Sequence, residues 1–222
     1  MTETAKILTT ISSLKDRGWF PGGSGGLAHL QKISESSQKI YVTPDKLNSV
    51  KANDLFLLRS LYGQQDIQTP LNKVDNGLEL SPWTSIFLEI IGQKQATCVA
   101  ALHTKWATLA TRAAFHSWRK NSESYPNLLR LSHWGMIKDI TGKDEMLIPV
   151  VDYTDSGTML AKTKEALALY PESCAILIRD YAVVVWERSL KLLESRAEAI
   201  EYLCELQVAD INLFSGYSDS LL

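Results

Sequence analysis

The sequence predicts an α/β fold with a mixed β-sheet. Runs of β-branched and aromatic residues alternate along the chain with segments whose apolar residues recur at helical spacing. Towards the C-terminal end, the apolar runs 175–178 and 183–186 are separated by four residues, a spacing that fits a hairpin turn. Because strands and helices interleave and one strand pair is adjacent in the chain, we expect a mixed sheet between helical layers.

The expected helices are identified by their apolar period and by the residues that end them. In the first helix the apolar residues recur from Ile7 to Leu14, and Gly18 stops it. Pro171 ends the amphipathic segment 156–169. The expected helices cover residues 7–14, 83–91, 104–114, 134–140, 156–169 and 187–209.

The expected strands are short runs rich in β-branched and aromatic residues. Residues 39–43 are the most typical of them, with Pro44 beginning a turn. Residues 61–80 and 121–126 are expected to be irregular. The expected strands cover residues 27–33, 39–43, 54–58, 97–102, 146–151, 175–178 and 183–186.

The chain shows no repeat, low-complexity tract or linker. We therefore expect residues 1–214 to form one domain and residues 215–222 to form a flexible tail.

Composition excludes several classes of protein. The 23 basic and 25 acidic residues nearly balance, which argues against a nucleic-acid partner. No apolar run approaches the roughly 20 residues that span a bilayer, so no membrane partner is expected. Residues 1–6 lack the profile of a signal peptide, and the three cysteines include no C-x-x-C pair. We expect a cytoplasmic protein whose cysteines, Cys98, Cys174 and Cys204, are buried thiols.

A series of motifs resembles the class II aldolase/adducin superfamily, and most closely its methylthioribulose-1-phosphate dehydratases. The glycine-rich loop G-W-F-P-G-G-S-G-G-L at 18–27 is similar to the G-W-x-x-G-T-S-G-N-x loop of these enzymes. The other similar segments are residues 40–44, 53–58, 129–138, 148–154 and 178–182. The resemblance implies one three-layer α/β/α domain with a largely antiparallel central sheet. It also implies a homo-oligomer, usually a tetramer, with active sites between subunits.

The chain departs from this family where the family binds its catalytic zinc. The ungapped match places Ala101 and His103 at the family's H-x-H pair, whereas a two-residue gap would make His103 the first ligand and delete the second. The third ligand position falls on Tyr181, and the family's acid/base Glu falls on Gly135. Three imidazoles with an open position are what make zinc a Lewis acid in such sites. We therefore expect no metal and no other cofactor, and neither a zinc dehydratase nor a zinc aldolase.

Three residues are candidates for catalysis. His103 has a side chain that can exchange protons near neutral pH, and Tyr181 could donate a hydrogen bond to a substrate carbonyl. His133 could replace the missing Glu as a proton carrier. The alternative for each is a packing role in a refilled cavity.

The candidate substrate-binding residues fall into three groups. Gly23, Ser24 and Gly25 could form a backbone nest for an anion, although the second phosphate loop of the family, at residues 44–49, has lost its glycine and gained an acid. Trp83 and Trp134 would supply flat apolar walls. The remaining candidates are Lys105, which is near His103 in sequence, and Asp180, which precedes Tyr181. Either could complete a group of polar side chains around these two residues.

Two functions fit these observations. The first is a metal-independent lyase, isomerase or cyclase that acts on a small, partly apolar carbonyl compound in a specialised biosynthetic pathway. The second is a catalytically inactive, adducin-like homologue that acts by oligomerisation or partner binding. An open pocket with convergent polar groups would favour the first.

Overall fold

The computed structural model describes residues 2–33, 38–60, 70, 72, 77–120 and 127–218. Within these ranges it leaves out the side chains of residues 59–60, 113, 115–120 and 212–218. The chain divides into two compact units. The first comprises Met1–His103 and Val185–Glu194, and the second comprises Thr104–Val184 and Ser195–Leu222.

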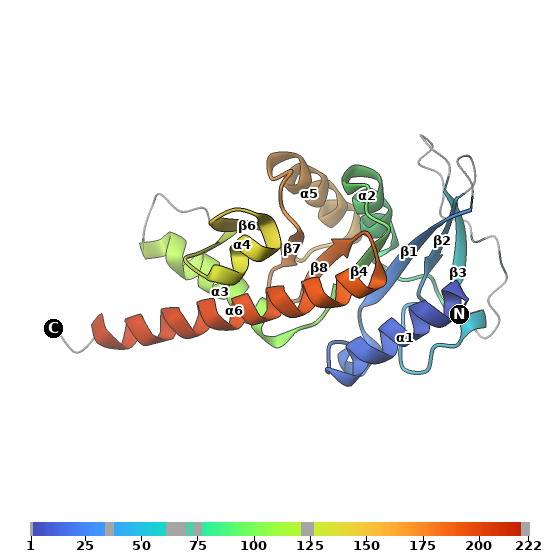
Figure 1. The fold of residues 1–222 in the computed structure, drawn as a ribbon, viewed down its shortest axis with the longest axis horizontal. Coiled ribbons are helices and arrows are strands. Elements are labelled where there is room, and N and C mark those ends of the chain that lie inside the picture. Colours follow the sequence, from blue (N-terminus) through green and yellow to red (C-terminus); the bar gives the residue numbers. More distant parts are fainter. Residues whose placement is uncertain are drawn as a thin grey trace. The chain divides into compact units, whose positions relative to one another are not determined.

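Four antiparallel strands form the sheet of the first unit, in the order β3-β2-β1-β4 (Figure 1). Burial alternates along β2 because every second side chain faces the same side of a strand. The end of β8 also belongs to this unit, where the Thr97 N–H donates to the Glu187 carbonyl at 3.0 Å. The strands are β1 (Gly26–Lys32), β2 (Gln38–Val42), β3 (Phe56–Ser60), β4 (Cys98–Leu102) and β8 (Ala182–Glu187).

Two helices pack on these strands. Helix α1 (Glu3–Asp16) begins at Thr2, whose side chain accepts the Ala5 N–H, and it packs against β1. Helix α2 (Thr84–Lys94) packs against β1 and β4. The expected helices at 7–14 and 83–91 are therefore confirmed, each with a few more residues than the apolar period indicated.

The second unit contains β5 (Leu128–Ser132), β6 (Glu145–Val151) and β7 (Ala175–Ile178), followed by the start of β8. The strand order is β8-β7-β6-β5; β6 runs parallel to β7 and antiparallel to β5. A tight turn joins β7 to β8, with the Tyr181 N–H donating to the Ile178 carbonyl at 3.0 Å. The predicted hairpin is confirmed, and so is the α/β fold with a central mixed sheet.

The helices of the second unit are α3 (Lys105–Lys120), α4 (Gly135–Thr141), α5 (Ser156–Leu169) and most of α6 (Leu190–Ser218). The Glu201 carboxylate accepts the N–H groups of Trp106 and Ala107, both at 2.9 Å, and so caps the start of α3. Helix α6 reaches Ser218, which lies inside the segment predicted as a tail; residues 219–222 are outside the described part.

Two strand predictions need correction. The sequence analysis placed no strand at residues 128–132, where β5 pairs with β6 over its whole length. The strand expected at 54–58 lies at Phe56–Ser60, because residues 52–54 form a short 3₁₀ turn that the Asp54 carboxylate closes on the Lys51 N–H. In the described residues no helix is both long and apolar enough to cross a bilayer.

A charged cluster in the second unit yields a prediction about stability at low pH. The Arg179 guanidinium donates to Asp152 at 2.7 Å and to the Asn127 amide oxygen at 2.8 Å, and Lys162 lies 3.3 Å from the same carboxylate. The hydrogen bond from Arg179 is the main cause that lowers the pKa of Asp152 below its usual 3.8.

The lowered pKa fixes the direction of the pH dependence. The stabilisation is present above the unfolded-state pKa and is lost as the pH falls through the folded-state pKa. We expect the Asp152→Asn variant to lose less stability than the wild type between about pH 4 and pH 2, measured by urea unfolding. An Asp139→Asn variant on exposed α4 is the control; an Asp152→Asn curve parallel to the wild type would contradict the prediction.

Candidate active site

The glycine loop of the first unit presents Ser24 between residues with left-handed backbone. Gly23 has φ +77° and Gly25 has φ +117°. A Cβ on Gly25 would lie 2.6 Å from the Phe20 ring and 2.7 Å from the Ala101 carbonyl oxygen. Glycine is required at this position because its backbone passes too close to β4 for a side chain.

The register between β1 and β4 brings Ser24 to His103. In this antiparallel pair Gly26 lies opposite Ala101, so the residue two before Gly26 faces the residue two after Ala101. The Ser24 hydroxyl lies 3.0 Å from His103 Nε2. The His103 N–H donates to the Trp19 carbonyl at 3.0 Å, which holds the backbone at the end of β4.

Trp83 forms an apolar wall beside His103. Its ring centroid lies 6.4 Å from the imidazole, with an angle of 64° between the two planes. Trp83 is buried, whereas Ser24 and His103 are half-buried. The structure thus brings together Ser24, Trp83 and His103, three residues that the sequence analysis proposed separately.

The loop at residues 44–49 lies against the glycine loop. The Leu47 N–H donates to the Gly23 carbonyl at 2.8 Å, and a Cβ on Gly23 would overlap the Asn48 side chain. A pocket of about 260 Å³ opens beside this contact, and its lining includes Lys46, Asn48 and Lys51. The sequence analysis did not select these residues, although the motif comparison covered the loop.

The described residues do not fit the zinc site of the resembled family. Ala101 is fully buried in β4 and offers only a methyl group, and His103 Nε2 already contacts a hydroxyl. Among the described side chains, no group of three His, Cys, Asp or Glu residues could hold a metal ion. The roles proposed for these residues therefore involve no metal ion.

Tyr181 and Asp180 lie in the β7–β8 turn of the second unit. The Tyr181 ring packs 4.3 Å from the Tyr153 ring. Asp180 has φ +54°, and its carboxylate accepts from Arg112 at 2.7 Å, while its N–H donates to Thr111 Oγ1 at 3.1 Å. Tyr181 and His103 belong to different units, and the catalytic role expected of Tyr181 stays a prediction.

Lys105 is exposed at the first turn of α3. Its ammonium group lies 4.6 Å from the centre of the Trp106 ring, a cation–π arrangement. Its proposed part in substrate binding likewise stays a prediction.

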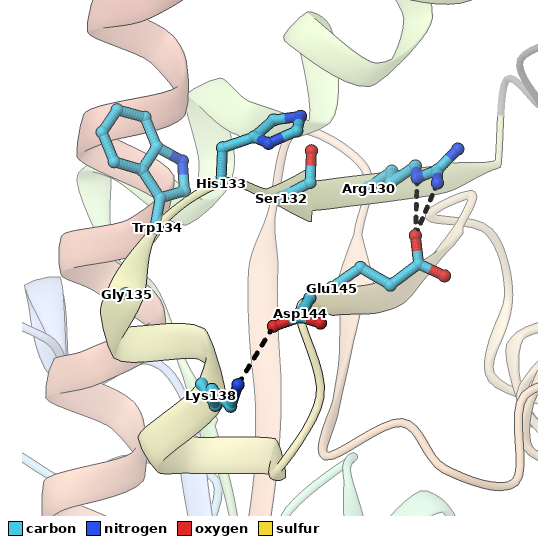
Figure 2. A pocket seen from close by; sticks show the side chains of 8 residues that line it. All are labelled: Arg130, Ser132, His133, Trp134, Gly135, Lys138, Asp144 and Glu145. Atoms are coloured by element: carbon cyan, nitrogen blue, oxygen red, sulfur yellow. Dashed lines mark hydrogen bonds and ion pairs between the residues drawn. The ribbon is translucent and has the colours of Figure 1, made fainter.

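His133 and Trp134 line an open pocket of about 730 Å³ in the second unit (Figure 2). His133 is exposed, with φ +70°, a backbone conformation that costs energy in a residue with a side chain. Trp134 Nε1 is buried and makes no hydrogen bond with the described residues. A Cβ on Gly135 would meet only open space.

Charged residues that the sequence analysis did not select complete this pocket. Figure 2 shows Arg130 paired with Glu145, at 2.7 Å, and Lys138 paired with Asp144, at 3.6 Å. Arg130 and Lys138 lie in segment 129–138, which is similar to the resembled family, and this similarity is a signal that could have found them. Glu145 begins β6 and Asp144 directly precedes it, and no motif marked either residue.

Two of the three cysteines are buried, as expected. Burial raises the pKa of the Cys98 thiol to about 12, and it also raises the pKa of Cys204. Cys174 is only half-buried, and its sulfur lies 3.9 Å from the Met146 sulfur. The prediction of a buried thiol is therefore wrong for Cys174, because the turn before β7 leaves it near the surface.

Comparison with known protein families gives a clear result. The model of the family described as "Class II Aldolase and Adducin N-terminal domain" matches residues 5–208. The chain belongs to this family. The resemblance found in the sequence motifs is thus confirmed over nearly the whole chain.

Curated relatives of this class II aldolase family member are named as dehydratases. Methylthioribulose-1-phosphate dehydratase of Gallus gallus is 25% identical over 204 residues, covering 86% of this chain and 76% of the relative. The enzyme of the same name from Chaetomium globosum is 26% identical, covering 86% of this chain and 77% of the relative.

Solved structures support the fold. An L-fuculose 1-phosphate aldolase matches with a TM-score of 0.66 at 12% identity, covering 96% of this chain and 89% of that one. A sugar-phosphate aldolase from Thermotoga maritima matches with a TM-score of 0.65 at 12% identity, covering 95% of this chain and 96% of that one.

Proposed function

We propose that this class II aldolase family member is a metal-independent enzyme of the lyase, isomerase or cyclase type. Its substrate would be a small, partly apolar compound with a carbonyl group. The observation that carries the proposal is the half-buried His103, held at the end of β4 by the Ser24 hydroxyl, next to the methyl group of Ala101. An imidazole in this position can move protons, whereas the ligand set that the family uses for zinc is incomplete.

His103 would remove or return a proton on carbon next to the substrate carbonyl. The 3.0 Å contact with Ser24 fixes the direction of Nε2. Trp83 would hold the apolar part of the substrate beside the ring.

Tyr181 is the proposed donor to the carbonyl oxygen. A phenol can stabilise negative charge that develops there, although more weakly than a metal ion would. Its role comes from the sequence match alone, and its own Phe variant tests it. His133, in the second-unit pocket, remains a second proposed proton carrier, with Trp134 as its apolar neighbour. The glycine nest, Lys105 and Asp180 are proposed to contact a small-molecule substrate. We also propose that the protein is a homo-oligomer and acts in the cytoplasm.

Proton exchange in heavy water tests the proposal without knowledge of the substrate. A panel of hydroxyketones and hydroxyaldehydes, some with an apolar substituent, is incubated with the protein in D₂O, and loss of the carbon-bound proton is followed by NMR. We expect catalysed exchange for at least one member of the panel. Absence of exchange across the panel would contradict the proposal and favour the adducin-like alternative.

A further inference from the structure

We propose that Ser24 and His103 form a nucleophile–base dyad that accepts an acyl group from an activated ester. This activity goes beyond the proposed function, although it uses the same residues of the first unit, Ser24, Trp83 and His103. The proposal rests on the 3.0 Å distance between Ser24 Oγ and His103 Nε2. This distance is within the hydrogen-bonding range in which an imidazole can activate a serine hydroxyl.

The loop around Ser24 presents its hydroxyl in a favourable way. Residues 22–26 read G-G-S-G-G, which matches the G-x-S-x-G pattern of nucleophile elbows. In an elbow that pattern joins a strand to a helix, whereas here it follows a 3₁₀ turn and leads into β1. The shared feature is local. The serine has no bulky neighbour on either side because Gly23 and Gly25 have no side chains, and both have left-handed backbone.

The backbone of Ser24 is itself relaxed. Its φ of -77° and ψ of 150° are extended values, and its N–H donates to the Pro21 carbonyl at 3.1 Å. The position of the hydroxyl is therefore set by the hydrogen-bonded loop and not by backbone strain at Ser24. Ser24 and His103 are half-buried, so each keeps part of its surface exposed.

The surroundings of the dyad favour a small acyl group. Trp83 is buried beside the imidazole, and the methyl group of Ala101 is fully buried two residues before it. The Gly25 N–H follows the serine in the chain, in the order in which nucleophile elbows supply one oxyanion donor. A short aliphatic acyl group on an alcohol of low pKa fits such a site better than a long chain does.

Acyl transfer to Ser24 needs neither a metal ion nor an oxidant or reductant. Ser24 Oγ forms a bond to the ester carbonyl carbon as its proton moves to His103 Nε2. The bond between the carbonyl carbon and the alcohol oxygen then breaks. The alcohol either takes the proton from His103, or leaves as its anion while His103 releases that proton to solvent, so that His103 is again neutral. Water attacks the acyl-serine with His103 as base, which releases the carboxylic acid and restores the hydroxyl.

The test uses p-nitrophenyl acetate as the acyl donor and the full-length protein. Release of p-nitrophenolate is followed by absorbance, and acetylation is located by mass spectrometry of intact protein and of peptides. We expect one acetyl group on Ser24 in the wild type and in the control variant Ser12→Ala, which removes an exposed hydroxyl on α1 of the same unit. In Ser24→Ala and His103→Gln we expect at least a tenfold lower yield of adduct at this loop.

Other outcomes would overturn the dyad. Adducts confined to lysines, or a Ser24→Ala variant that releases p-nitrophenolate as fast as the wild type, would each do so. Circular dichroism checks folding, and Ser24→Cys covers the case in which loss of the hydroxyl unfolds the protein. The expected result for Ser24→Cys is a thioester at residue 24, and its absence in a folded variant would also overturn the dyad.

The dyad and the proposed function fail separately. A protein that exchanges carbon-bound protons but is never acetylated at Ser24 refutes the dyad alone. A protein that is acetylated at Ser24 but exchanges no proton refutes the proposed function alone.

Discussion

Replacing His103 with Ala is expected to lower the rate of proton exchange on a responsive carbonyl compound by about 10²- to 10⁴-fold, the usual contribution of a general acid or base. The imidazole is the group at the end of β4 that can carry a proton, and the nearby Ala101 cannot replace it. The rate is measured by NMR in D₂O at saturating substrate.

A Gln variant separates proton transfer from packing at this position. His103→Gln keeps an amide group that can hydrogen-bond to Ser24 but cannot titrate near neutral pH. Both His103 variants should be slow, while Ser12→Ala, on the exposed side of α1, should match the wild type. A His103→Gln variant with wild-type exchange would show that His103 only fills space and that another group carries the proton.

Replacing Gly25 with Ala is expected to have the largest effect on stability, at least about 3 kcal/mol, because backbone strain and overpacking add. The new Cβ would meet the Phe20 ring and the Ala101 carbonyl oxygen, and φ is +117°. The contact with the Ala101 carbonyl oxygen cannot relax without moving β4 or the start of β1, and the Phe20 ring is buried. The free energy of unfolding is measured with urea.

Gly22 offers the matched control in the same loop. Its φ is also positive, at +63°, but a Cβ there meets nothing within 4 Å. Gly22→Ala should cost only about 1 kcal/mol, the cost of a left-handed alanine. Equal losses in the two variants would contradict the close approach of Gly25 to β4.

Much of the fold could be predicted because its strands carry local signals. The alternation in β2 and the four-residue gap between the apolar runs 175–178 and 183–186 are visible in a short window of sequence. Strand β5 was missed because only Leu129 and Leu131 of its five residues are buried, and the strand gains its definition from pairing with β6. The local sequence of β5 does not indicate that pairing.

The candidate site could be predicted residue by residue but not as an arrangement. Ser24 and His103 stand out by residue type and motif, yet they are 79 positions apart. Their contact depends on the register that sets Gly26 opposite Ala101, which no local pattern determines. The salt-bridged pocket around His133 was missed for the same reason, since its two acids, Asp144 and Glu145, lie at and just before the start of another strand, β6.

Metal analysis of the purified protein tests the central claim most directly. Transition metals are measured per chain by inductively coupled plasma mass spectrometry, before and after dialysis against a strong chelator, and proton exchange is measured on the same samples. The account predicts far less than one transition-metal ion per chain and the same exchange rate in both samples. One tightly held ion per chain, removed by the chelator together with the activity, would contradict it.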